Sequence, residues 1–235
     1  MSGEEKKVDL FDILGPTMVG PSSSHTAGAV RIGGMARALL GGKPVEAQLY
    51  LHGSFAQTGQ GHGTDRALIA GLLGMQPDDL RIPSSFEEAE REGLHFTFRN
   101  VNLGNVHPNT VIIHAREASG KTLHLQAAST GGGRILVTEL NEIPVHFTGD
   151  LNTLIVQNRD DRGQIAEVTG ALSGVGVNIA FMSLCRDRRG GSAIMVIEVD
   201  QPVPQETVAH LRRMEGILSV TYYEKNESEA RVCRS

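Results

Sequence analysis

Three segments rich in glycine, serine and threonine carry the residues best suited to bind and transform a small charged molecule. They are residues 20–28 (GPSSSHTAG), 53–65 (GSFAQTGQGHGTD) and 129–133 (STGGG). We expect the first two to be loops that each run directly into a helix. The N-terminus of a helix offers free backbone N–H groups and the positive end of the helix dipole, so it attracts a carboxylate or a phosphate.

Two histidines lie within these segments, and imidazole is the side chain whose unperturbed pKa is closest to neutral pH. His25 follows three serines, and His62 is flanked by glycines. Asp65 follows His62 by three residues and can orient an imidazole or cap a helix. Each segment alone is also explained as an ordinary cap or a sharp turn. Together, with two histidines placed before helices, they favour an anion-binding site.

Other loop chemistries do not fit these segments. No lysine follows a glycine at P-loop spacing, no GxGxxG opens a strand–helix–strand unit, and no GxSxG marks a hydrolase nucleophile. The remaining histidines are weaker candidates. His52, His114 and His124 lie in strand-like runs, and His107 precedes a proline in a polar loop.

The composition indicates a globular protein of one large or two ordinary domains. The 235 residues are 40% hydrophobic, and 22 basic against 27 acidic side chains give a net charge of −5. This balance argues against a nucleic-acid partner, and no apolar run reaches the roughly 18–20 residues that span a membrane. The first residues lack the apolar stretch of a secretory signal, so we expect a cytoplasmic protein.

The two cysteines limit the cofactors that this chain can hold. Cys185 and Cys233 lie 48 positions apart and have no CxxC partner motif. They cannot supply the thiolates of an iron–sulfur cluster or the paired ligands of a structural zinc site. We therefore expect no metal site in this chain, and any such cofactor would have to come from another chain.

The chain changes character in the polar stretch 148–152, where we place a domain boundary. Beyond it, the pattern predicts strands at 154–157, 177–184, 192–199 and 217–223, with helices near 165–172 and 206–214. Asp160 or Asp161 is the expected cap of the first of these helices. The order βαββαβ is a ferredoxin-like split unit.

This second segment resembles an ACT domain over its whole length. The resemblance rests on residues 161–168 (DRGQIAEV) after the first strand and 176–179 (GVNI) before the second. In that family the turn lets backbone amides face a small ligand, usually an amino acid, often across a homodimer interface. The implied effector-binding residues are Asp161, Gly163, Gln164, Ile165, Asn178 and Ile179. Gly163 is equally explained by a tight strand-to-helix turn.

The residues before the boundary predict a mixed α+β domain. Alternating apolar residues indicate strands at 45–52, 94–98 and 123–127, and residues 110–115 and 135–138 are further strand candidates. Apolar stripes predict helices at 29–40 and 65–73, and Ser85 with Glu88 suggests a capping box for a short helix through Arg91. The fold class is α+β, with domains at 1–148 and 152–225 and a C-terminal tail at 226–235.

Together with the ACT-like segment, residues 20–26 (GPSSSHT) and 61–65 (GHGTD) resemble the β chain of the iron–sulfur-dependent L-serine dehydratases. In that family the enzyme is one long chain or an α/β pair, and the α chain carries the cysteines of a [4Fe–4S] cluster. The shortage of cysteines here fits the split arrangement. The first domain is also similar to one found beside ACT modules in some phosphoglycerate dehydrogenases, so the fold alone does not define the activity.

The resemblance implies a lyase of amino-acid degradation and gluconeogenesis that converts L-serine to pyruvate and ammonia. It would act only with its α chain, whose open iron draws electron density from the serine hydroxyl, and without pyridoxal phosphate. His62 or His25 would remove the Cα proton, and we prefer His62. The implied substrate-binding residues are Ser22, Ser23, Ser24, Thr26, Thr64, Asp65, Ser129, Thr130 and Gly131. The alternative is a non-catalytic amino-acid sensor built on an ACT dimer.

Overall fold

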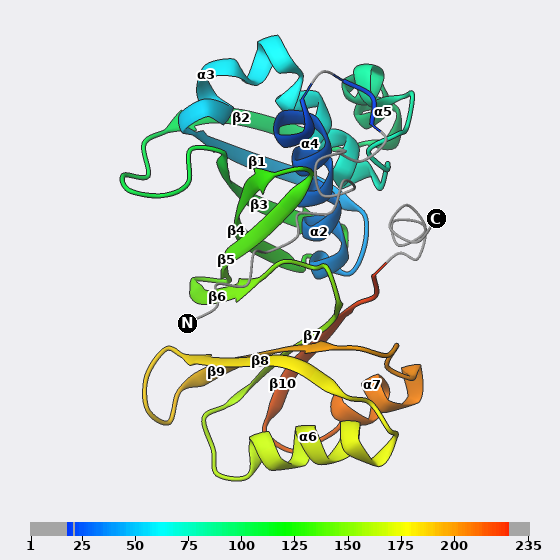
Figure 1. The fold of residues 1–235 in the computed structure, drawn as a ribbon, viewed down its shortest axis with the longest axis vertical. Helices are drawn as coiled ribbons and strands as arrows, with labels where there is room; N and C mark the ends of the chain where they lie inside the picture. The colour runs from blue at the N-terminus through cyan, green and yellow to red at the C-terminus, as the bar shows by residue number, and fades with distance from the viewer. Residues whose placement is uncertain (1–17, 21, 226–235) are drawn as a thin grey trace, which may run out of the picture.

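The computed structural model describes residues 18–20 and 22–225, with residues 58–62 described by their backbone alone. The first part of the chain contains η1 (Ser23–Ala27, a π-helix), α2 (Gly28–Leu40), β1 (Pro44–His52), α3 (Gly53–His62), α4 (Thr64–Leu73), η2 (Ile82–Ser84), α5 (Ser85–Glu92), β2 (His95–Val101), β3 (Thr110–Glu117), β4 (Thr122–Gly131), β5 (Arg134–Leu140) and β6 (Ile143–Phe147). The second part contains β7 (Asn152–Arg159), α6 (Gln164–Gly174), β8 (Ile179–Arg186), β9 (Ser192–Val199), α7 (Gln205–Leu211) and β10 (Ile217–Tyr223). Each part builds one sheet, and the two parts stack along the long axis of the molecule (Figure 1). No helix among the residues described is long and apolar enough to cross a membrane.

The first sheet has six strands in the order β2-β1-β3-β4-β5-β6. Only β1 and β2 run parallel to each other, and the other neighbours are antiparallel. All five strands predicted for this part are confirmed, because their inward side chains, such as Leu49 and Ile113, fill one core. The sequence analysis missed β6, a short edge strand that contains Pro144.

Helices α2 and α4 pack on one face of this sheet and against each other. Their backbones approach closely at glycines, since a Cβ added at Gly71 would collide with the carbonyl oxygen of Val30, and one added at Gly33 with that of Leu68. This contact locks the start of α2 beside α4. Because η1 leads into α2 and α3 leads into α4, it also brings the first two glycine-rich segments together.

The second sheet has the order β10-β7-β9-β8 and is antiparallel throughout, which confirms the predicted βαββαβ arrangement. Helices α6 and α7 cover its lower face in Figure 1, and Leu154 and Leu172 lie in the core between them. The opposite face carries Ile155, Ile194 and Val196, which join the core of the first part. The two sheets are therefore held together by a continuous apolar contact.

Two predicted helix caps are wrong. The residue before α6 is Gly163, with φ +94°, whereas Asp160 pairs with Arg186 across 2.9 Å instead of capping the helix. Ser85 is the first residue of α5, and its hydroxyl donates to the carbonyl oxygen of Arg66 rather than closing a capping box with Glu88. In both places a partner distant in sequence holds the polar side chain.

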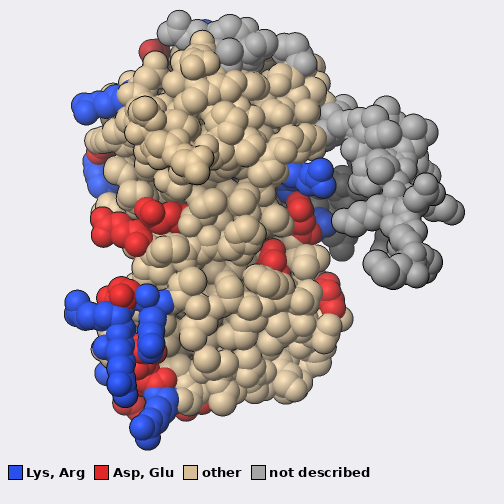
Figure 2. All heavy atoms as spheres, turned by 60° about the vertical axis from the view of Figure 1, so that its left-hand side comes forward, with Lys and Arg blue, Asp and Glu red and all other residues tan. Residues whose placement is uncertain are grey.

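Charged side chains gather along one side of the lower half of the molecule, where basic and acidic groups alternate (Figure 2). The ion pairs in this half include Arg186 with Asp160 and Arg159 with Asp161, at 2.9 and 3.3 Å. Exposed pairs of this kind contribute little to stability. These charged side chains form a solvent-exposed surface at one end of the second sheet.

Candidate active site

The first glycine-rich segment is a helical turn rather than the loop that we predicted. Residues 23–27 form the π-helix η1, which continues directly into α2. Ser22 lies at its start, and the Ser22 hydroxyl oxygen accepts a hydrogen bond from the backbone N–H of His25 at 3.1 Å. Single π turns are rare and occur frequently at functional sites, where they displace side chains from the regular helical positions.

The imidazole of His25 is held on three sides. Its Nε2 lies 3.0 Å from the hydroxyl oxygen of Ser54, and its Nδ1 lies 3.2 Å from that of Ser22. The buried ring of Phe55 meets it edge-on at a centroid distance of 5.4 Å. Since the Ser22 oxygen already accepts the His25 backbone N–H, its own proton is well placed to be donated to Nδ1. This favours the tautomer in which Nε2 carries the proton and donates it to Ser54.

The second segment is also helical where we predicted a loop. Residues 53–62 form α3, and Gly63, with φ +69°, separates α3 from α4. The helix starts at Gly53, whose φ is +56° and where an added Cβ would lie 2.6 Å from the Pro108 carbonyl oxygen. The next residue, Ser54, donates its backbone N–H to that same oxygen at 2.8 Å. A contact with a distant loop therefore sets where this helix begins.

His62 is the last residue of α3, and its side chain lies outside the part of the chain that is described. The predicted partner Asp65 lies in the first turn of α4, where its carboxylate accepts the backbone N–H of Arg66 at 2.8 Å. We predicted Asp65 as a possible cap of this helix, but the residue that precedes α4 is Gly63. Asp65 is thus anchored to its own helix.

The third segment is the end of β4 and the turn into β5. Ser129, Thr130 and Gly131 belong to the strand, which corrects the expectation of a loop there. Ser129 is fully buried against the start of α2, since a Cβ added at Gly28 would collide with its hydroxyl oxygen. Gly131 lies beside Ser24, whereas the side chain of Thr130 is exposed. The third segment therefore contacts the first.

Each of the three segments contributes one buried hydroxyl without a hydrogen-bond partner among the residues described. They are Thr26, Thr64 and Ser129, at 3%, 0% and 0% exposure. Burying an unpaired polar group costs about 1–3 kcal/mol, so such groups are rare in ordinary cores. These three lie together at the junction of η1, α4 and β4, which makes this junction a candidate binding site.

The sequence analysis missed Ser54, which is the residue that joins the first two segments. Its signal was weak, because it is a single serine at the start of a glycine-rich stretch that follows a strand. What identifies it is its contact with His25, 29 positions away. Two of the weaker histidine candidates adjoin the second segment, since His52 directly precedes Gly53 and His107 directly precedes Pro108. The other two, His114 and His124, lie on the sheet face opposite the apolar core with tilted rings whose centroids are 4.3 Å apart, and burial together with His124 lowers the pKa of His114.

The predicted effector residues of the second part lie in two places. Asp161, Gly163, Gln164 and Ile165 form the turn into α6, where Gln164 is buried and donates to the Glu215 carbonyl oxygen at 3.0 Å. Asn178 and Ile179 lie at the start of β8, whose other end, Arg186, reaches that turn through Asp160. The two groups therefore lie at opposite ends of β8, whose seven residue steps span about 23 Å within one chain.

No group of three or more His, Cys, Asp or Glu side chains that could hold a metal ion occurs within the described ranges. Cys185 is a half-buried thiol on β8 that packs against the core of the first part. Cys233 lies outside the described residues. One cysteine does not fit the ligand set of an iron–sulfur cluster, which takes several thiolates.

Comparison with known proteins agrees with this two-part organisation. A family model described as serine dehydratase beta chain matches residues 7–95, and one described as ACT domain matches residues 152–216. The L-serine dehydratase, beta chain, of Peptoniphilus asaccharolyticus is 37% identical over 215 residues, which cover 91% of this chain and 97% of that protein. The probable L-serine dehydratase, beta chain, of Bacillus subtilis is 42% identical over 212 residues, which cover 90% and 96%.

Two further likenesses concern parts of other proteins. The D-3-phosphoglycerate dehydrogenase of Synechocystis is 26% identical over 200 residues, which cover 80% of this chain but 34% of that protein. The solved ACT domain from the GTP pyrophosphokinase of Chlorobium tepidum is 18% identical, with a TM-score of 0.27, and covers 30% of this chain and 94% of that structure.

Proposed function

Because this chain belongs to the family of L-serine dehydratase β chains, we propose that it forms one half of an enzyme that converts L-serine to pyruvate and ammonia, with an α chain as the other half. The observation that carries the proposal is the convergence of the three segments around η1 and the start of α2. The contact of His25 with Ser54 and the contact of Gly28 with Ser129 join residues from all of them. The product pyruvate suits amino-acid degradation and gluconeogenesis.

We assign the removal of the Cα proton to His62 and a positioning role to His25. A general base needs a ring nitrogen directed at the substrate, and both nitrogens of His25 lie within hydrogen-bond distance of serine hydroxyls. His62 stands between glycines at the end of α3. Loss of the Cα proton and departure of the hydroxyl as water leave aminoacrylate, which reacts with water to give pyruvate and ammonia.

The polar groups around η1 are proposed to hold the substrate. L-Serine carries a carboxylate, an ammonium and a hydroxyl, and each needs hydrogen-bond partners inside a site from which water is removed. The candidates are the hydroxyls and backbone amides of Ser22, Ser23, Ser24, Thr26, Thr64, Ser129, Thr130 and Gly131, together with the carboxylate of Asp65. The three unpartnered hydroxyls favour this assignment.

We propose that the α chain supplies the cysteines of a [4Fe–4S] cluster, because this chain has too few to hold one. The resemblance to this family implies that the reaction proceeds without pyridoxal phosphate. We place the enzyme in the cytoplasm, where reducing conditions preserve cluster thiolates and the free thiol of Cys185. The proposed domains are 1–148 and 152–225, and the proposed tail, 226–235, lies outside the described residues.

The ACT domain is proposed to form a homodimer and to regulate the enzyme. β8 is an edge strand, and its Phe181 and Leu184 are 45% and 42% exposed. Exposed edges of this kind pair readily with another strand. Two-fold antiparallel pairing of β8 with its copy would bring the Ile179 end of one chain beside the Arg186 end of the other. This would unite the two halves of the effector site that a single chain keeps apart.

The test is anaerobic co-purification with the cysteine-rich α chain, followed by an assay of serine-dependent pyruvate formation. We expect activity from the complex and none from this chain alone. His62→Ala should lower turnover by about a hundredfold or more, the usual scale for a general base. The control is His210→Gln, which changes an exposed histidine on α7. Near-normal turnover of the His62 variant would remove it from the mechanism. Amino-acid binding without turnover by the complex would support the sensor.

A further inference from the structure

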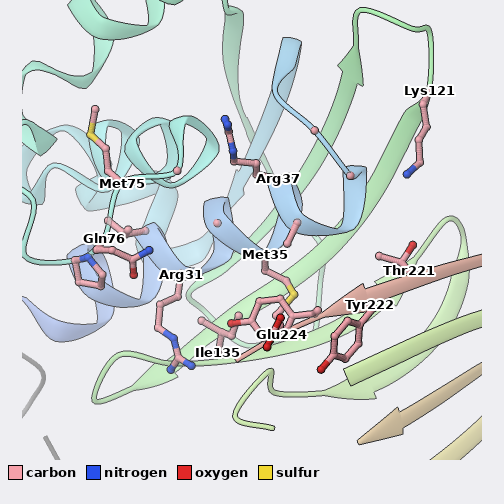
Figure 3. Close-up of a pocket in the computed structure, with 18 of the residues that line it drawn as sticks. Arg31, Met35, Arg37, Met75, Gln76, Lys121, Ile135, Thr221, Tyr222 and Glu224 are labelled. Atoms are coloured by element: carbon pink, nitrogen blue, oxygen red, sulfur yellow. The ribbon is translucent and has the colours of Figure 1, made fainter. Parts of the chain in front are cut away.

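A cavity of about 600 Å³ lies between the two halves of the molecule (Figure 3). One wall is α2 with the residues that follow α4, and the other is β10. None of the residues proposed to hold serine lines it. It is also distinct from the turn at Gly163, because its β10 residues pair with residues 153–156 of β7, about 10–20 Å along the strand from Arg159, where that turn begins.

The lining of this cavity is strongly basic in a chain whose net charge is −5. Arg31 and Arg37 come from α2, Lys121 from the turn before β4, and Arg212 from the end of α7, whereas Glu224 is the only acidic residue among the described residues that line it. Arg37 and Arg212 donate to backbone carbonyl oxygens, of Leu72 and Val220. Such bonds orient a guanidinium without cancelling its charge.

The remaining lining includes an apolar surface. Met35, Met75 and Ile135 line it together with the basic groups, and Lys121 lies at the opposite end of the cavity from Met75 in Figure 3. Cavities of this size that combine apolar walls with a few charged groups are typical of small-molecule sites. The basic groups come from three separate elements, so they are suited to a ligand with more than one negative group.

We propose that this cavity binds a small organic anion with at least two negative groups, carboxylate or phosphate, and that it is an effector site. This goes beyond the proposed dehydratase function. The route to the active site is Arg31, which donates to the carbonyl oxygen of Gly133 at 3.0 Å and pairs with Asp150 at 3.1 Å. Gly133 closes the turn after Ser129–Gly131, and Asp150 lies in the connection between the sheets. A ligand that attracts Arg31 therefore acts on the turn at Gly133 and on the connection at Asp150.

The test measures binding to the full chain by calorimetry at low ionic strength, with succinate and pyrophosphate as the dicarboxylate and diphosphate probes. We expect saturable one-site binding of at least one probe. Lys121→Gln should weaken it about two- to fivefold, the usual effect of one exposed charge. Glu224→Gln, which removes the acid, should strengthen it. Arg99→Gln, an exposed arginine on β2, is the charge-matched control.

Two results would overturn the site. One is no saturable binding of either probe up to about 10 mM, and the other is equal affinity of the Lys121, Glu224 and Arg99 variants, which would indicate an adventitious ion only. These measurements need no α chain, so their failure is distinguishable from failure of the dehydratase proposal. In the reconstituted enzyme, the bound probe should change the KM for serine, and Lys121→Gln should reduce that change. An unchanged KM at saturating probe would refute the effector role.

Discussion

Replacing Ser54 by alanine tests whether His25 is positioned by a partner that only the fold supplies. The substitution removes the hydroxyl 3.0 Å from Nε2 and leaves the half-buried imidazole without that partner. A hydrogen bond of this kind is worth about 0.5–1.5 kcal/mol, which corresponds to about a two- to tenfold change in the population of the correctly oriented ring. The helix should survive, because the contact of α3 with Pro108 is made by the Ser54 backbone.

We therefore expect kcat of the complex with the α chain to fall about two- to tenfold, with a smaller change in the KM for serine. The ¹⁵N shifts of the His25 ring should report an altered balance of tautomers, which loss of a merely structural serine would not cause. Ser54→Thr keeps a hydroxyl and should restore most of the rate. Ser219→Ala, which changes an exposed serine on β10, is the control. Unchanged turnover together with unchanged His25 shifts in Ser54→Ala would refute the reasoning.

Two further predictions concern stability. Gly33→Ala places a Cβ against the Leu68 carbonyl oxygen and should lower the free energy of unfolding in urea by about 1–3 kcal/mol, whereas Gly34→Ala on the same helix meets nothing within 4 Å and should be neutral or stabilising; equal effects would contradict the close α2–α4 contact. Burial and His124 lower the pKa of His114 below its ordinary 6.5, so the unfolded chain takes up this proton first as pH falls. The contribution of neutral His114 to the free energy of unfolding is complete above pH 6.5 and is lost as the pH falls below it. In that range the free energy of unfolding of the wild type should fall more steeply than that of His114→Gln, by at most about 1.4 kcal/mol per pH unit. Parallel stability curves would show that His114 is not responsible.

Local patterns in the sequence were sufficient for most of the architecture. Inward and outward side chains alternate along β1, β3 and β4, and apolar residues repeat at helical spacing along α2 and α4, because burial on one face imposes that period on each element alone. The same holds for the βαββαβ order of the second part. Motifs of a few adjacent residues were likewise enough to indicate the family.

Contacts between distant segments decided the rest. Residues 53–62 are poor helix formers by composition, and α3 begins where Gly53 meets Pro108. The edge strand β6 likewise depends on its pairing with β5, and no local pattern indicated the π-helix η1. His25 contacts Ser54, 29 positions away, and Gly28 at the start of α2 contacts Ser129 on β4. Periodicity reports which side of an element is buried, but which atoms then meet is set only when the elements pack.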